Sequence, residues 1–224
     1  MSRIKISLSS SNELFDYPLN SKVNGFINRL LGDNNVYHGN FSRYSVSSLY
    51  GGVYDENGRV SYPNGSYFYI SSDDDVFMDK IDDGLCYASG YDICGMRYMG
   101  MDNCNFVVGS EYDIVRCMNL IVREKDVALT YKDSNFIDVL LEKSKKKLLH
   151  CGYSEELVNT LSIELFRVNG ARVRTLKIDN VVNICNRVMF IVRGSDIIRR
   201  ALYEIGMGMC TGFGFGNVTL NKKR

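Results

Sequence analysis

The sequence of 224 residues lacks any apolar run near the ~20 residues that a membrane-spanning helix requires. Its polar N-terminus, MSRIKISLSSS, also lacks the apolar segment of a secretory signal peptide. Hydrophobic residues nevertheless make up 45% of the chain, far above the level of disordered proteins. We therefore expect a folded, soluble protein in the cytoplasm.

The sequence also lacks the closely spaced ligand pairs that are typical of zinc sites. Its seven cysteines include no C-x-x-C pair, and an odd number does not suit a disulfide framework, which belongs mainly to secreted chains. We expect free thiols, several of them buried. Neither a structural metal nor a cofactor is expected.

Net charge is nearly absent, at +1, but the two halves differ. Residues 1–123 hold 10 Lys/Arg against 15 Asp/Glu, a net of −5, and much of this acidity lies in SSDDDVFMDKIDDG. Residues 124–224 hold 17 against 11, a net of +6. The C-terminal half can therefore present a basic surface to a polyanion.

Hydropathy patterns predict the order strand, helix, two strands, helix, strand in each half of the chain. In the first half we expect strands at 3–8, 44–50 and 66–71, with one or two more within 104–123. Helices are expected near 20–31, capped by Asn20 or Ser21, and at 73–81, with hairpin turns inside 51–65.

In the second half we expect strands at 117–123, 188–192 and 217–220 and a hairpin of 160–168 with 172–179 around Asn169–Gly170. Helices are expected at 135–150 and after a Ser195 cap, with Ile197 among the inward residues of the latter. The fold class predicted is α+β, with two tandem ferredoxin-like (RRM-like) domains at residues 1–115 and 116–224.

The stretch RALYEIGMGMCTGFGFGNVTL places five glycines after the last predicted helix: Gly206, Gly208, Gly212, Gly214 and Gly216. It contains no lysine for a Walker loop, and a dinucleotide fingerprint would precede a helix rather than follow one. A helix cap and a kinked strand explain one or two of these glycines. The alternative is a bare loop whose exposed amides let a phosphodiester backbone approach closely.

This stretch resembles the C-terminal glycine-rich motif of the CRISPR-associated repeat-processing endoribonucleases of the RAMP superfamily. Other features follow in the order of that family: the RIKISL strand, one histidine after the first helix, MNLIVR, and FIVRGSDIIRRALYEIG before the loop. The resemblance implies two ferredoxin-like domains and metal-independent cleavage of precursor CRISPR RNA within its repeats. The products it implies are a 2′,3′-cyclic phosphate and a 5′-hydroxyl end.

His38 is the residue on which this activity depends. From the residues alone it is either an exposed loop histidine or a catalytic one. The resemblance favours catalysis, because family members with a clear catalytic histidine place it in this loop, and imidazole transfers protons near neutral pH. We expect His38 to act as general acid or, second, as base, assisted by Tyr37, Arg43 and Tyr44.

The expected RNA contacts are the five glycines and the basic residues of the C-terminal half. These are Lys145, Lys146, Lys147, Arg172, Arg174, Lys177 and Arg193. The expected partners are CRISPR repeat RNA and other proteins of a CRISPR effector complex, with the chain a monomer or homodimer. The alternative function is a non-catalytic RAMP-type RNA-binding subunit, which would not need His38.

Overall fold

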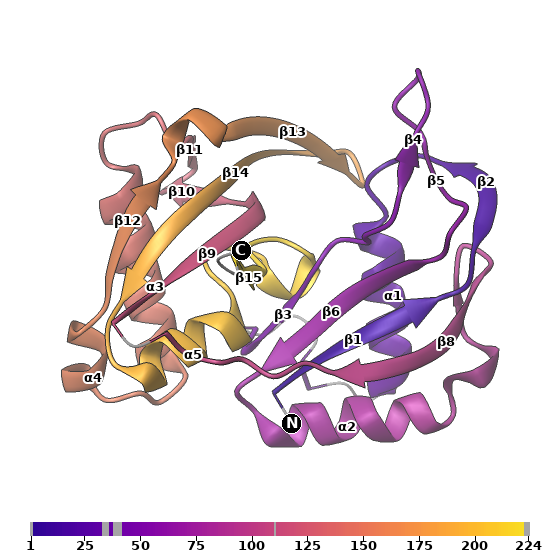
Figure 1. Ribbon diagram of the computed structural model, residues 1–224, viewed down its shortest axis with the longest axis horizontal. Coiled ribbons are helices and arrows are strands. Elements are labelled where there is room, and N and C mark those ends of the chain that lie inside the picture. The colour runs from indigo at the N-terminus through magenta and orange to yellow at the C-terminus, as the bar shows by residue number, and fades with distance from the viewer. Residues whose placement is uncertain (1, 33–35, 38–41, 110, 222–224) are drawn as a thin grey trace. The chain divides into compact units, whose positions relative to one another are not determined.

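A computed structural model describes the chain except residues 1, 33–35, 38–41, 110 and 222–224. The chain forms two compact units (Figure 1). The first is Met1–Asn105 together with Gly212–Gly214, and the second is Phe106–Thr211 with Phe215–Arg224. The expected boundary between residues 115 and 116 falls inside one strand of the second unit.

The first unit is built on an antiparallel sheet in the order β3-β6-β1-β8, the order of a ferredoxin-like fold, extended by β7. Two helices, α1 and α2, contribute to the core on one face of this sheet. The elements are β1 Arg3–Leu8, α1 Asn20–Leu31, β3 Tyr44–Val46, β6 Ser66–Ser72, α2 Asp75–Cys86, η1 Ala88–Gly90, β7 Asp92–Ile93 and β8 Met96–Asn103.

The alternation of buried apolar and less buried polar residues along β1 explains why the helices pack on one face of this sheet. Ile4, Ile6 and Leu8 are buried, and they pack with the apolar stripe of α1 and with Phe68 of β6. The rings of Phe26 and Phe68 meet edge to face at 5.9 Å. Each fully buried side chain of this size contributes about 1.5–3 kcal/mol of transfer free energy.

A second, three-stranded sheet in the order β2-β5-β4 belongs to the same unit. The expected turn at Asn57–Gly58 is present between β4 and β5, with Gly58 at φ 78°. One expectation is wrong, because the strand expected at 44–50 ends at Val46, and the strands β2 and β8 were not predicted. The bounds are β2 Ser11–Phe15, β4 Val53–Tyr54 and β5 Val60–Tyr62.

The second unit contains an antiparallel sheet in the order β12-β14-β9-β15, again a ferredoxin-like order, and β13 also pairs with β14. Its core includes the inward faces of α3 and α5. The elements are β9 Tyr112–Leu120, β10 Val122–Glu124, β11 Val127–Leu129, α3 Phe136–His150, α4 Glu155–Asn159, β12 Ser162–Phe166, η2 Val168–Gly170, β13 Arg172–Ile178, β14 Val181–Arg193, α5 Asp196–Ile205, η3 Thr211–Phe213 and β15 Val218–Leu220.

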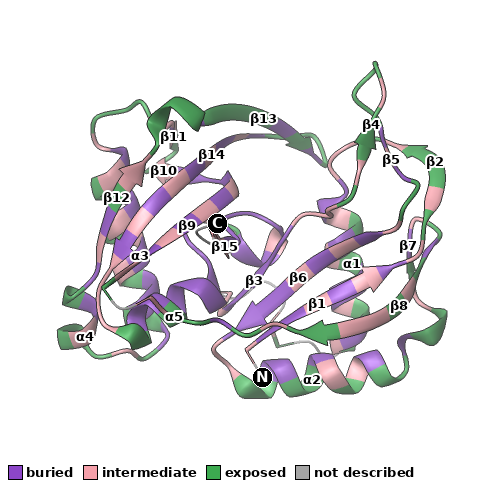
Figure 2. Ribbon diagram, viewed as in Figure 1, coloured by how far each residue is buried: buried purple, intermediate pink, exposed green. Residues whose placement is uncertain are grey.

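The hairpin expected between 160–168 and 172–179 is wrong. β12 and β13 both pair with β14, whose 13 residues are long enough to take them in succession. The hairpin turn is instead at Asp179 and Asn180, whose φ of 46° and 67° match the left-handed positions of a type I′ turn. Figure 2 shows β13 largely exposed, in contrast to the buried middle of β14.

Further expectations concern the helix caps and the cysteines. The cap at Ser195 is confirmed, since its hydroxyl accepts from the Ile198 amide, but Ile197 is exposed rather than inward. The expected α1 cap is wrong: Leu19 holds that position, and Asn20 is a buried helical residue. All seven cysteines are free thiols, and burial raises the pKa of the Cys117 thiol to about 12. No helix among the described residues is long and apolar enough to cross a membrane.

Replacing Ser195 with alanine should destabilise the protein by about 1 kcal/mol, because the Ile198 amide loses its acceptor. Chemical denaturation measures this loss. Ser195→Asp is the matched control, since aspartate caps equally well and should retain most of the stability. Equal losses in both variants would contradict a capping role.

Candidate functional site

The glycine-rich segment begins where α5 ends. Gly206 terminates the helix with φ 75°, and its amide donates to the Leu202 carbonyl. The segment then crosses itself: the Met207 amide donates to the Gly216 carbonyl at 2.9 Å, and the Gly216 amide donates to the Asn119 carbonyl at 2.9 Å. A side chain at residue 216 would collide with the Met207 carbonyl, and φ of 62° disfavours one there as well. The crossing therefore requires glycine.

The middle of the segment, Gly212–Gly214, belongs to the first unit. A Cβ added to Gly212 would lie 2.8 Å from the Tyr44 ring, and one added to Gly214 would meet the Asn20 amide. Asn20 Nδ2 also donates to the Phe213 carbonyl at 2.8 Å. These contacts hold the three residues against the start of α1 and β3.

Protein atoms thus occupy the space beside these glycines. A Cβ on Gly208 would lie 2.5 Å from the Ile121 carbonyl, and the other four glycines are buried. The expectation that missing side chains leave room for an RNA backbone therefore needs correction, because the room is taken by neighbouring backbone and side chains. RNA contact by this segment stays a prediction.

Lys147 was expected to face solvent with Lys145 and Lys146, and this is wrong. Its side chain is buried, with 7% of the residue exposed. The Nζ atom donates to the Ile205 carbonyl at 2.6 Å and to Thr211 Oγ1 at 2.7 Å. Ile205 ends α5, where carbonyls lack helical partners and carry partial negative charge, so a cation is stabilised there. Lys147 therefore supports the glycine segment from within.

The other predicted cations on this side are surface groups. Lys145 donates to Asn159 Oδ1 at 3.4 Å, and Lys146 pairs with Glu142 one helical turn away. Arg193 forms an exposed ion pair with Glu164 at 2.6 Å. Exposed pairs of this kind contribute little to stability, so these cations can exchange their partners for phosphates.

The predicted basic group on β13 divides between two faces. Side chains alternate along a strand, which places Arg172 and Arg174 on one face and Lys177 on the other. All three are exposed, and among the described residues neither Arg174 nor Lys177 pairs with a carboxylate. Arg172 donates to the carbonyls of Asn169 and Ala171.

Two of the groups expected to assist catalysis, Tyr37 and Tyr44, lie against Phe77. The Tyr44 ring stacks on it at 4.4 Å, and the Tyr37 ring meets it edge-on at 5.0 Å. Arg43 binds the carboxylate of Asp73 through Nε and Nη2, at 3.3 and 3.1 Å.

The chemistry of this cluster follows from its surroundings. Burial raises the pKa of Tyr37, and the neighbouring Asp74 raises it further. Burial likewise raises the pKa of Tyr44. Both phenols therefore stay protonated at neutral pH and can donate hydrogen bonds but not act as bases. Arg43 has part of its charge compensated by Asp73. His38 lies outside the described residues.

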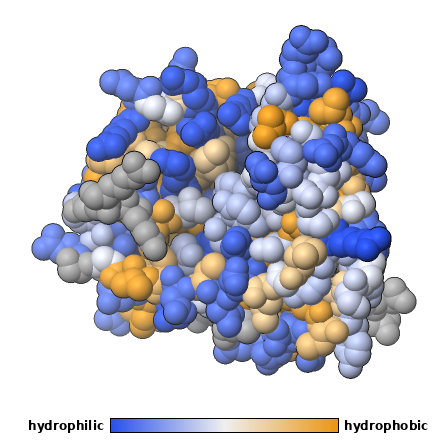
Figure 3. Space-filling model, turned by 45° about the vertical axis from the view of Figure 1, so that its right-hand side comes forward, coloured by the Kyte–Doolittle hydropathy of each residue, from blue (hydrophilic) through white to orange (hydrophobic). Residues whose placement is uncertain are grey.

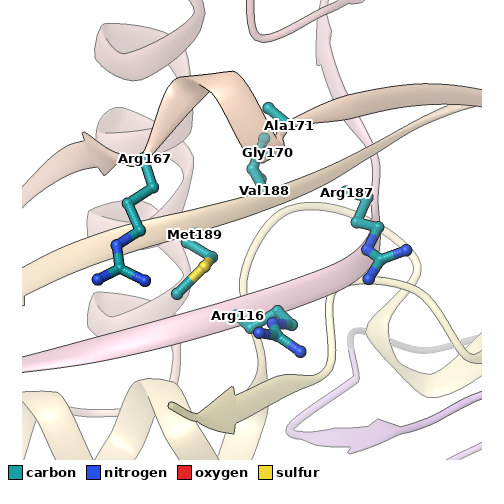
Figure 4. A pocket seen from close by; sticks show the side chains of 7 residues that line it. All are labelled: Arg116, Arg167, Gly170, Ala171, Arg187, Val188 and Met189. Carbon is teal, nitrogen blue, oxygen red and sulfur yellow. The ribbon is translucent and has the colours of Figure 1, made fainter. Parts of the chain in front are cut away.

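A pocket that the sequence did not indicate lies in the second unit (Figure 4). Three arginines line it: Arg116 from β9, Arg187 from β14 and Arg167 from the turn before η2. Its cavity volume is about 230 Å³. The arginines are up to 71 positions apart in the sequence, and the pairing of β9 and β12 with β14 brings them together, so no local motif could have revealed the pocket.

Three tyrosines form a second group that the sequence did not single out. The rings of Tyr50 and Tyr67 stack at 5.1 Å, and Tyr69 meets both edge-on. The ammonium of Lys5 lies 4.9 Å from the centre of the Tyr67 ring, and the guanidinium of Arg3 lies 4.6 Å from that of Tyr69. Because Phe68 and Ile70 point into the core, alternation places Tyr67 and Tyr69 on the opposite face of the sheet.

Comparison with known families identifies the second unit. Residues 118–220 match the family model described as CRISPR associated protein Cas6, C-terminal. The resemblance to CRISPR-associated proteins of the RAMP superfamily is thereby confirmed. No curated protein matches the chain by sequence.

Several solved structures share the fold of this chain over nearly its full length. A RAMP protein described as binding different RNA substrates has a TM-score of 0.84 at 18% identity, covering 99% of this chain and 100% of its own. The product of a Cas6-related gene from Pyrococcus furiosus has a TM-score of 0.82 at 18% identity, covering 100% and 99%. A structure described as CRISPR associated protein Cas6 gives 0.76 at 18%, covering 99% of both. The predicted pair of ferredoxin-like domains is confirmed.

Replacing Lys147 with methionine should destabilise the Cas6-type domain by about 1–3 kcal/mol, because two buried acceptors lose their donor. Denaturant titration measures the change. Lys146→Met is the matched control on the same helix, where only an exposed pair is lost and about 0.5 kcal/mol or less is expected. A Lys147 variant as stable as the Lys146 variant would contradict the supporting role.

Proposed function

We propose that this protein binds precursor CRISPR RNA and cleaves it within the repeat, without a metal ion, to release guide RNAs. The observation that carries the proposal is the match of residues 118–220 to the Cas6 C-terminal family. Structures with the same fold include a Cas6 product complex at 13% identity with a TM-score of 0.67. They also include a Cas6 mutant in which a histidine is replaced by alanine, with a TM-score of 0.61.

The proposed reaction is an internal transesterification. The 2′-hydroxyl oxygen attacks the adjacent phosphorus, the bond from phosphorus to the 5′-oxygen breaks, and a 2′,3′-cyclic phosphate remains. The 2′-hydroxyl loses one proton and the leaving 5′-oxygen gains one. His38 is proposed to supply the proton to the 5′-oxygen, a role for which an imidazole is suited near neutral pH.

Tyr37, Tyr44 and Arg43 are proposed to assist by stabilising charge on the phosphate. Both phenols keep their protons at neutral pH and can donate hydrogen bonds to phosphate oxygens. Arg43 enters this role with its guanidinium oriented by Asp73. Tyr37 directly precedes His38 in the sequence.

The tyrosine group of the first unit is proposed to bind unpaired bases. In RRM domains the same sheet position carries aromatic rings on which bases stack, and Lys5 and Arg3 add positive charge beside the rings. On the face seen in Figure 3, hydrophobic side chains are scattered among hydrophilic ones within the coloured residues. Such a surface suits a polar polyanion better than a large apolar partner.

One assay tests the activity. Wild-type protein incubated with repeat RNA and EDTA should give a single cut, and His38→Ala should slow the cut by about 10²–10⁴-fold while RNA affinity stays within a few-fold. His150→Ala, which removes the other histidine, is the matched control and should cleave normally. Cleavage by the His38 variant at the wild-type rate would remove this residue from the mechanism. Binding without any cleavage by the wild type would favour the RNA-binding subunit.

Tyr67→Leu should weaken binding of single-stranded RNA by about 5- to 100-fold, since each base stacked on an aromatic ring is worth about 1–3 kcal/mol. Tyr67→Phe keeps the ring and should bind nearly as well as the wild type. Fluorescence anisotropy measures both affinities, and thermal unfolding checks that both variants are folded. Equal affinity of the two variants would show that the ring does not stack on a base.

A further inference from the structure

The pocket in the second unit combines three guanidinium groups with an apolar wall. Arg116, Arg167 and Arg187 surround it, and the Met189 side chain lies between Arg167 and Arg187 in the view of Figure 4. Val188 and Ala171 complete the lining. At ~30 Å³ per water in the liquid, a cavity of about 230 Å³ has room for more than a single small ion.

Within the described part of the chain, no carboxylate compensates the charge of these arginines. Among the described residues, no carboxylate lies within ion-pair distance of any of the three, and none lines the pocket. Arg116 reaches only the amide oxygen of Asn221 at 3.4 Å, and Arg167 lies over the Phe166 ring at 5.2 Å. Other arginines of the same unit do have carboxylate partners: Arg193 with Glu164, Arg199 with Asp113 and Asp196, and Arg200 with Glu204.

The local backbone holds the positive charges of the pocket arginines close together. Arg187 lies directly opposite Arg172 in the β13–β14 ladder, and like charges in that position are destabilising. The register between β14 and β9 shifts at Asn186/Val188, beside Arg187, and such irregularities redirect side chains. Arg167 has φ 51°, an uncommon conformation for a non-glycine residue. The facing arginines and the left-handed backbone of Arg167 each cost stability in the free protein, and a bound anion would offset the charge repulsion.

We propose that this pocket binds one phosphate of single-stranded RNA, with the attached ribose or base against Met189 and Val188. Guanidinium groups bind phosphate oxygens through paired hydrogen bonds, which explains why all three cations are arginine. The apolar wall favours a nucleotide over free inorganic phosphate. The proposal rests on the RNA-binding part of the proposed function but not on cleavage.

Salt dependence distinguishes one shared phosphate from a diffuse basic patch. For single-stranded RNA, each neutralised phosphate contributes about 0.7 to the slope of log affinity against log salt. Affinity for a short uridine-rich RNA is measured over a range of salt for the wild type, Arg116→Gln, Arg187→Gln and the double variant. If all three arginines bind the same phosphate, each single variant should lose only part of the ~0.7 of slope that one phosphate contributes, and the double variant should lose more than either single variant but no more than ~0.7.

Four outcomes overturn the proposal. A loss of about 1.4 in the double variant means that the arginines contact separate phosphates. An unchanged slope in the double variant means that the pocket does not contact RNA. The control Arg59→Gln/Arg97→Gln removes two exposed positive charges of the first unit. An equal loss of slope in this control means that the effect is not specific to the pocket. Absence of RNA binding by the wild type overturns this proposal together with the proposed function. Binding without cleavage leaves it standing.

Thermal unfolding separates a ligand site from a structural one and identifies the anion. Without ligand, Arg187→Gln should unfold at the same or a higher temperature than the wild type, because its repulsion with Arg172 is removed. The short RNA should raise the unfolding temperature of the wild type more than inorganic phosphate does, and neither should do so in the double variant. A lower unfolding temperature of Arg187→Gln with unchanged RNA affinity would show a structural arginine. Equal stabilisation by inorganic phosphate would indicate a free-anion site.

Discussion

The backbone crossing of Met207 and Gly216 is the constraint on which the C-terminal part of the fold depends. Its two hydrogen bonds join the end of α5 to β9, and they bring the chain to the position where β15 pairs with β9. Lys147 adds a buried charge at the end of α5, where the last carbonyls need donors. A dense glycine run therefore has a structural cause here: the chain passes close to itself and to its neighbours, and side chains would prevent it.

The arginines of the second unit fall into two classes with different physical roles. Arg199 is buried and holds Asp113 at 3.0 Å and the Gly109 carbonyl at 2.7 Å, so it fixes the start of β9 against α5. Such a charge has to be paired, because an unpaired one would be strongly destabilising. The pocket arginines Arg116, Arg167 and Arg187 have no carboxylate partner among the described residues. Because this half of the chain carries an excess of positive charge, unpaired arginines are tolerated in it only at a surface that anions can reach. Net charge alone would not separate these classes.

The elements that local patterns determine were predictable, and the contacts between distant residues were not. The alternation of RIKISL and the apolar spacing of α1 and α3 identify those elements, and Ser195 marks the start of α5. The pairing of β12 and β13 with β14 was missed because a neighbouring Asn-Gly pair suggested a simpler hairpin, while the length of β14 decided otherwise. Lys147 looked like one more lysine on a solvated face. Its burial follows from where α5 ends, 58 positions away, which helix periodicity does not reveal.

The tyrosine group and the arginine pocket, neither of which was predicted from the sequence, would set the same requirement for a bound nucleic acid. The tyrosine group needs bases whose faces are free, and in an A-form duplex those faces are stacked on one another. The arginine pocket is concave and partly apolar, so a phosphate enters it only with a flexible backbone that can turn its sugar or base toward Met189. A rigid duplex satisfies neither condition without distortion. As proposed RNA sites, both surfaces, each considered within its own unit, would therefore favour single-stranded RNA over the paired form.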